Sequence, residues 1–256
     1  TLARKSIEEL LSTFKDGKNF GSIIPVDAFD YDLCKSYIDD VDHSKINIFT
    51  YDAYEFQKQI MTILKVAQIM ATKYHVVATN PPYLNRMNAQ LKEYVDKHYK
   101  DYKTDLFSVF MYRNFELCSP GGYSGFMTPF VWMFIKSYEK LRGYIIKNKS
   151  ITSLIQMEYS AFEEATVPIC SFVLKNSQED SVGLYFRLSE FTGGMEVQKK
   201  KVLEAIANPN CGYYYETSEN NFEKIPGMPI AYWASDNIID DYEKSKLIGD
   251  YAVARN

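Results

Sequence analysis

The chain is poor in the residues that bind metals or form disulfide bridges. It has 4 cysteines and 3 histidines in 256 residues, and no two cysteines form a C-x-x-C pair. The histidines at positions 43, 75 and 98 show no metal-ligand spacing relative to the cysteines. We therefore expect no zinc site or other metal, and a reducing cytoplasm is the simplest setting for the protein.

Long hydrophobic runs and an excess of positive charge are also lacking. No run approaches the roughly eighteen apolar residues of a membrane span, and no secretory signal opens the chain, so we expect a soluble protein. The 29 basic and 33 acidic residues give a net charge of −4. Because DNA binding through the phosphate backbone needs a basic groove, such a groove would have to be local or supplied by other segments.

Apolar residues are present in periodic patterns that alternate between helical and strand spacing. Helix–strand alternation as far as residue 157 predicts an α/β fold with a mostly parallel sheet, and the closely spaced later strands predict an antiparallel edge. Expected helices cover residues 3–15, 30–41, 54–71, 105–118, 135–147 and 196–207. Expected strands cover residues 22–26, 74–79, 123–127, 151–157, 169–175 and 184–188.

The most informative segment is a short apolar run that stops in Asn80-Pro81-Pro82-Tyr83. At average residue usage, this tetrapeptide occurs by chance in roughly one chain of this length per thousand. Each proline fixes its own φ, lacks an N–H and keeps the preceding residue extended. The pattern therefore predicts a stiff ledge at the end of a strand, although an ordinary strand-ending turn is the alternative.

Such a ledge suits a flat heterocycle that bears an amino group. The Asn80 side-chain oxygen and the Pro81 carbonyl can each accept one N–H, while the Tyr83 ring stacks on the heterocycle. Two acceptors outside the ring plane would localise the nitrogen lone pair, which could then attack an electrophilic methyl group in line. This is catalysis by positioning and directed polarity, without a metal or a titrating base.

The tetrapeptide and the segments after it resemble amino-methyltransferases that use S-adenosylmethionine. The resemblance is strongest to adenine-N6 DNA methylases, and within them to the Eco57I-like restriction-modification methylases and the methylase of BREX phage-exclusion systems. Residues 104–115 resemble the helix after the catalytic loop, residues 120–129 the next strand and loop, and residues 161–174 a later motif. The resemblance covers roughly residues 50–190.

This resemblance implies a Rossmann-like methyltransferase fold and methyl transfer from S-adenosylmethionine to adenine N6 in double-stranded DNA. It assigns the catalytic role to Asn80, Pro81, Pro82 and Tyr83, and it places Phe162 against the second face of a base that is flipped out of the duplex. Core packing is the alternative for Phe162.

Two weaker assignments accompany this site. Arg86 is a candidate phosphate contact at the start of a lysine-rich stretch, residues 84–103, which is either a local basic surface or a solubilising exposed flank. Asp52 is a candidate for the donor adenosine by position, with a surface or capping role as the alternative. Both assignments depend on the resemblance and on position in the sequence.

One feature of the family is missing. The resembling methylases carry a Gly-rich donor loop before the tetrapeptide, and no G-x-G precedes a helical pattern in residues 1–79. We therefore expect a piece of a larger enzyme, with a catalytic portion over residues 1–190 and an appendage over 191–256 that leads toward a target-recognition region. Methylation of a protein glutamine or an RNA guanine, and a non-catalytic scaffold, stay open as alternatives because related enzymes share the tetrapeptide.

Overall fold

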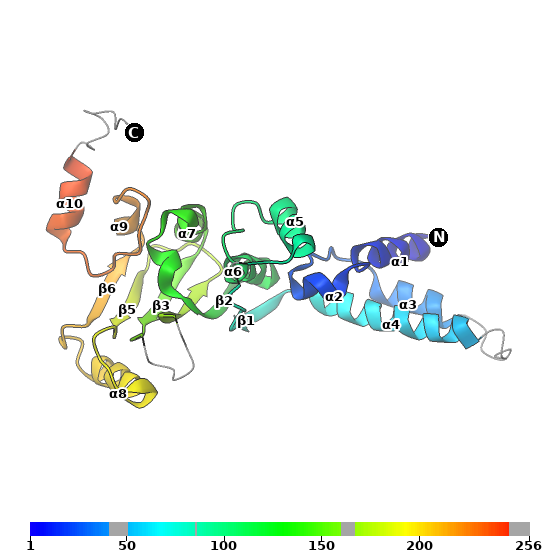
Figure 1. Ribbon diagram of the computed structural model, residues 1–256, viewed down its shortest axis with the longest axis horizontal. Helices are drawn as coiled ribbons and strands as arrows, with labels where there is room; N and C mark the ends of the chain where they lie inside the picture. The colour runs from blue at the N-terminus through cyan, green and yellow to red at the C-terminus, as the bar shows by residue number, and fades with distance from the viewer. Residues whose placement is uncertain (41–50, 85, 160–166, 246–256) are drawn as a thin grey trace. The chain divides into compact units, whose positions relative to one another are not determined.

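The computed structural model describes residues 1–40, 51–84, 86–159 and 167–245, together with the backbone but not the side chains of residues 51–53 (Figure 1). Contacts divide the chain into two compact units. The first comprises Thr1–Tyr74 and Asn88–His98, and the second comprises His75–Met87 and Tyr99–Asn256.

The first unit is helical in its described part. Its elements are α1 (Leu2–Thr13), α2 (Gly17–Phe20), the 3-10 turn η1 (Gly21–Ile23), α3 (Tyr31–Asp39), α4 (Tyr51–Ala71) and α5 (Ala89–His98). Side-chain oxygens begin two of these helices, since Thr1 accepts from the Arg4 N–H and Asp30 from the Leu33 N–H. Apolar residues at helical spacing form the core, which contains Ile7, Leu10, Cys34, Ile38, Ile60, Leu64 and Ala67.

The strand expected at residues 22–26 is wrong. Its start lies in the turn η1, and Gly21 has a φ of 58°, a conformation that interrupts an extended chain. Pro25 lacks the N–H that a ladder of hydrogen bonds requires. The adjacent residues Ile23 and Ile24 are both buried, so this run does not present alternate faces as a half-buried strand does.

The second unit is built on a six-stranded sheet in the order β1-β2-β4-β3-β5-β6. The strands are β1 (Tyr74–Thr79), β2 (Cys118–Pro129), β3 (Ser150–Gln156), β4 (Ile169–Lys175), β5 (Val182–Arg187) and β6 (Tyr214–Ser218). Strand β4 is antiparallel to β2 and to β3, β3 is parallel to β5, and β5 is antiparallel to β6. Thus β2, β3 and β5 share one direction. The predicted α/β fold, with a mostly parallel sheet and an antiparallel edge, is confirmed, since β2, β3 and β5 run in one direction and β6 forms an antiparallel edge. Strand β4 adds a reversed strand inside the sheet.

Helices cover both faces of this sheet (Figure 1). The described helices of this unit are α6 (Leu106–Leu117), α7 (Glu139–Asn148), α8 (Gly194–Ala207), α9 (Asn220–Glu223) and α10 (Asp236–Lys244), with 3-10 turns η3 (Phe130–Met133) and η4 (Lys136–Tyr138) before α7. Successive strand residues point to opposite faces. Tyr185 of β5 joins the main core with residues of α6 and α7, whereas Phe186 packs with Ala205 of α8. The boundary expected near residue 190 stays a prediction.

Candidate functional site

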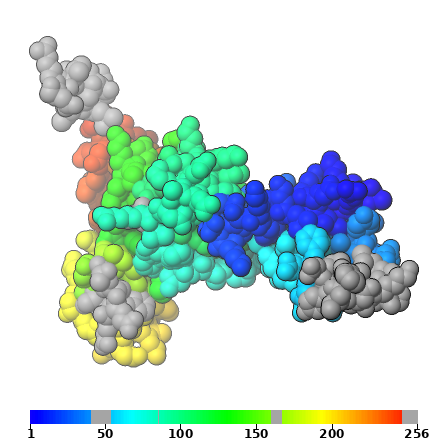
Figure 2. Space-filling view, turned by 45° about the vertical axis from the view of Figure 1, so that its right-hand side comes forward, coloured from blue at the N-terminus to red at the C-terminus, as the bar shows by residue number. Residues whose placement is uncertain are grey.

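The Asn80–Tyr83 segment leaves the end of β1 without entering a helix or another strand. Pro81 is buried, whereas Asn80 and Pro82 are exposed and the Tyr83 side chain is 38% exposed. In Figure 2 the blue-green part of the chain, which by residue number includes this segment, lies on the visible surface. The segment is therefore anchored by one proline and presents its amide and its ring to solvent.

The Tyr83 side chain is held from two directions. Its hydroxyl lies 3.1 Å from Asn80 Oδ1 and 3.3 Å from the carbonyl oxygen of Met127 in β2. The Phe107 ring of α6 meets the Tyr83 ring edge-on, with centroids 6.4 Å apart and an interplanar angle of 88°. The tyrosine is thus fixed by both the neighbouring strand and the following helix.

The groups around this ring are neutral near pH 7. Burial raises the pKa of the Tyr83 hydroxyl, and the nearby Cys170 thiol raises it further. Burial likewise raises the pKa of Cys170 itself to about 12, and this thiol lies 3.8 Å from Thr128 Oγ1. Tyr83 therefore keeps its proton as a hydrogen-bond donor, and Cys170 is a packing residue without thiolate character.

The other candidate residues are not assembled with this segment by the structure. Arg86 is exposed, three residues after Tyr83. Phe162 lies outside the described residues. Asp52 is in the first turn of α4, where the side chain is not described. The roles of all three stay predictions.

Two supports of Tyr83 were missed by the sequence reasoning. Phe107 and Met127 fall inside the segments 104–115 and 120–129, which the sequence marked as related to the family. The only signal was therefore their proximity to motifs. Which ring and which carbonyl meet Tyr83 depends on the packing of α6 and β2 against the end of β1.

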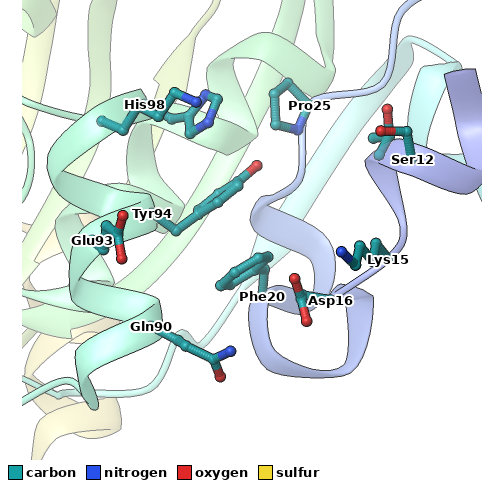
Figure 3. Close-up of a pocket in the computed structure, with 11 residues that line it drawn as sticks. Ser12, Lys15, Asp16, Phe20, Pro25, Gln90, Glu93, Tyr94 and His98 are labelled. Carbon is teal, nitrogen blue, oxygen red and sulfur yellow. The ribbon is translucent and has the colours of Figure 1, made fainter.

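The lysine-rich stretch 84–103 is divided between the two units. Within the first unit, Lys92 pairs with Asp96 at 2.7 Å on the surface of α5. Lys97 lines a cavity of about 610 Å³ that also receives the carboxylates Asp16 and Glu93 (Figure 3). These acidic neighbours offset the lysines, so this part of the stretch does not form a purely basic groove.

The same cavity contains a stack of three aromatic rings. The ring centroids are 4.1 Å apart for Phe20 and Tyr94 and 4.4 Å apart for Tyr94 and His98. Burial lowers the pKa of His98, and the nearby Lys97 lowers it further. The rings therefore join α5 to the Gly17–Phe20 helix through mutual stacking within the first unit.

Two cavities of the second unit lie beside α7, with volumes of about 390 and 780 Å³. Neither is lined by Asn80, Pro81, Pro82 or Tyr83. The Asn80–Tyr83 ledge is thus an exposed segment that lines neither of these two cavities.

No helix in the described ranges is both long and apolar enough to cross a membrane. Over the same part of the chain, no group of three or more His, Cys, Asp or Glu residues is arranged to hold a metal ion.

Comparison with known proteins identifies the family. The model of the Eco57I restriction-modification methylase family matches residues 7–162, which is more than half of the chain. The chain belongs to the Eco57I methylase family. The resemblance inferred from Asn80–Tyr83 and the later motifs is confirmed.

Two relatives of this Eco57I-family chain are adenine-specific methyltransferases by name. PglX of Lacticaseibacillus casei (strain Zhang) is 34% identical over 241 residues, covering 90% of this chain and 20% of PglX. BrxX of Escherichia coli O9:H4 (strain HS) is 31% identical over 255 residues, covering 97% of this chain and 20% of BrxX. The chain thus spans about a fifth of the length of these curated relatives.

Among solved structures, a DrdV–DNA complex shares the fold of this Eco57I-family chain. The TM-score is 0.50 at 12% identity, over 70% of this chain and 20% of that one. At this identity the likeness concerns the fold alone.

Proposed function

We propose that this chain is the part of an adenine-N6 DNA methyltransferase that holds the target base, in a restriction-modification or phage-defence system. The observation that carries the proposal is the exposed ledge at the end of β1, with the Asn80 amide beside a Tyr83 ring that is fixed by Phe107 and Met127. Membership of the Eco57I family and the names of PglX and BrxX support the same reaction.

The ledge suits the amino group of a flipped adenine. A carbonyl oxygen has two lone pairs, so Asn80 Oδ1 can accept from the Tyr83 hydroxyl and still accept one adenine N–H. The Pro81 carbonyl is the proposed second acceptor, and the Tyr83 ring supports one face of the base. Stacking of this kind contributes about 1–3 kcal/mol per base and offsets part of the cost of unstacking it.

S-adenosylmethionine is the proposed methyl donor and would supply the electrophilic methyl group. No Gly-rich loop of the kind that would hold this donor occurs in the sequence of residues 1–79, where Gly17 and Gly21 are isolated. The steps above therefore concern the target base alone. Asp52 stays a proposed neighbour of the donor adenosine.

Double-stranded DNA is the proposed substrate, with Phe162 on the second face of the base and Arg86 on a phosphate. The net charge of −4 implies that most backbone contacts come from local patches or from other segments of the full-length protein. A protein glutamine or an RNA guanine would need the same acceptors, but the names of both relatives favour adenine.

The test is Asn80→Ala in the full-length protein. Because the amide acts at the amino nitrogen, we expect methyl transfer to be abolished while DNA affinity stays within about threefold. Asn148→Ala is the control, since Asn148 is exposed and its amide donates to the Tyr144 carbonyl at 2.9 Å within α7. If Asn80→Ala keeps turnover within about tenfold of the parent (1.4 kcal/mol), the catalytic assignment is wrong.

A further inference from the structure

Leu84, the residue after the ledge, makes hydrogen bonds through both its backbone N–H and its backbone carbonyl. The Leu84 N–H donates to Asp105 Oδ1 at 2.9 Å, and the Leu84 carbonyl accepts from the Leu106 N–H at 3.1 Å. These two partners are adjacent in the chain and form the start of α6. The backbone that leaves Tyr83 is therefore attached to the first turn of a helix.

The Oδ1 atom of Asp105 accepts hydrogen bonds from two segments, the residue after the ledge and the first turn of α6. Asp105 is the N-cap of α6, where Oδ1 also accepts from the Phe107 N–H at 3.1 Å, and Ser108 Oγ completes a capping box with the Asp105 N–H at 3.3 Å. Its side chain is buried, with 8% exposed. Burial raises the pKa of the Asp105 carboxyl, and the backbone N–H groups of Phe107, Leu84 and Leu106 oppose that rise.

Another aspartate N-cap shows what is unusual about Asp105. Asp30 begins α3 by accepting from the Leu33 N–H at 2.9 Å, a bond that closes within the helix it caps. Asp30 is exposed, whereas Asp105 is buried and reaches a residue 21 positions away. A helix cap requires only the first kind of bond. The bond to Leu84 is additional.

We propose that Asp105 is a positioning residue for methyl transfer, which fixes the Asn80–Tyr83 ledge by holding the Leu84 N–H. This inference rests on the proposed function. The same turn of α6 carries Phe107, whose ring meets the Tyr83 ring edge-on. The first turn of α6 therefore contacts both the backbone that follows Tyr83 and the Tyr83 ring.

The helix that Asp105 caps is packed into the main core. Helix α6 is buried along most of its length, including Leu106, Val109, Met111 and Phe115. An acceptor that must meet an amino nitrogen in line is sensitive to displacement, since a shift of about 1 Å can lower a rate a hundredfold. Anchoring the ledge to a packed helix limits such shifts.

The experiment uses Asp105→Ser and Asp105→Asn in the full-length protein, with Asp30→Ser as the matched control. Serine is as good an N-cap as aspartate, so α6 keeps its cap, but its oxygen is one bond closer to the backbone and leaves the Leu84 N–H without this acceptor. The readouts are kcat and KM for DNA, and hydrogen exchange at the Leu84 amide.

For Asp105→Ser we expect kcat to fall at least about tenfold with KM within threefold, and Leu84 exchange to accelerate at least about tenfold. Asp105→Asn keeps an uncharged acceptor, which makes a weaker hydrogen bond. We expect it to be intermediate, with both quantities changed roughly two- to fivefold. Asp30→Ser should leave kcat and Leu84 exchange as in the parent.

Unchanged kcat or unchanged Leu84 exchange in Asp105→Ser overturns the proposal. If that variant does not fold, Asp105→Asn decides: parallel changes in exchange and kcat support the proposal, and any other result overturns it. Amide exchange does not depend on catalysis. A failure of the proposed function would therefore appear separately, as unaltered turnover in Asn80→Ala.

Discussion

The Tyr83 hydroxyl has two acceptors within reach, Asn80 Oδ1 at 3.1 Å and the Met127 carbonyl oxygen at 3.3 Å. A hydroxyl has one proton, so it donates to one of them at a time. The Phe107 contact involves only the ring. In the proposed function, the Tyr83 hydroxyl orients the neighbouring amide and its ring supplies the stacking surface.

These two contributions are separable by substitution. Tyr83→Phe keeps the ring, and we expect kcat/KM for DNA to fall less than tenfold. Tyr83→Ala removes the stacking surface, worth about 1–3 kcal/mol, so we expect a fall of roughly 5- to 150-fold. The control is Tyr242→Ala, at an exposed tyrosine of α10. Equal losses in Tyr83→Phe and Tyr83→Ala would contradict the stacking role.

At the scale of elements, Arg142 of α7 joins three segments of the second unit. Its Nη1 donates to the carbonyls of Trp132 at 2.8 Å and Ile135 at 2.7 Å, and its Nη2 donates to the Gly227 carbonyl at 2.7 Å. Its Nε lies 3.1 Å from the Gly227 and Met228 carbonyls. The guanidinium is therefore buried among backbone carbonyls of η3, the loop before α7, and the turn at residues 227–228.

The turn at residues 227–228 is strained, because Met228 has a φ of 49°, a left-handed conformation that non-glycine residues rarely adopt. The hydrogen bonds from Arg142 hold this turn in place. We expect Arg142→Lys to destabilise the second unit by about 2–4 kcal/mol, since a lysine cannot supply the planar fork of donors and leaves charge-assisted bonds unmade. Thermal unfolding should show a Tm lower by roughly 5–10 °C.

Arg4→Lys is the matched control for this substitution. Arg4 is exposed and pairs with Glu8 along the surface of α1, so its replacement should leave Tm within about 1 °C. A Tm for Arg142→Lys as high as that of this control would show that the buried guanidinium does not hold the turn.

At the scale of the whole molecule, the described sheet stops at β1, which has β2 as its one neighbour in the described part of the chain. Val76 on this strand is 66% exposed. The Asn80–Tyr83 ledge therefore follows a strand that lies at the edge of the described sheet.

Titration calorimetry tests whether the 256-residue chain binds the proposed methyl donor by itself. We expect S-adenosylmethionine to bind with a Kd weaker than about 1 mM, less than about 4 kcal/mol of binding free energy. Its demethylated product, S-adenosylhomocysteine, is the matched second ligand and should behave in the same way. Micromolar binding of either compound would show that the chain forms a donor site by itself.

Local patterns predicted the elements that depend on short-range signals. The strands at residues 74–79 and 169–175 have the bounds expected from their apolar runs, and the prolines at 81 and 82 mark the end of the first one. The strand at 214–218 was missed because it is half-polar and gains its strand character by pairing with β5. Pairing partners of this kind cannot be read from a local window.

The sequence by itself determined the ledge and the family, because Asn80-Pro81-Pro82-Tyr83 restricts its own backbone and carries its own chemistry. Only the tertiary structure decided what holds the ledge in place. Met127 lies 44 residues from Tyr83, and Asp105 lies 21 residues from Leu84. Contacts over such distances form when β2 and α6 pack against the end of β1, and no local preference of the residues specifies them.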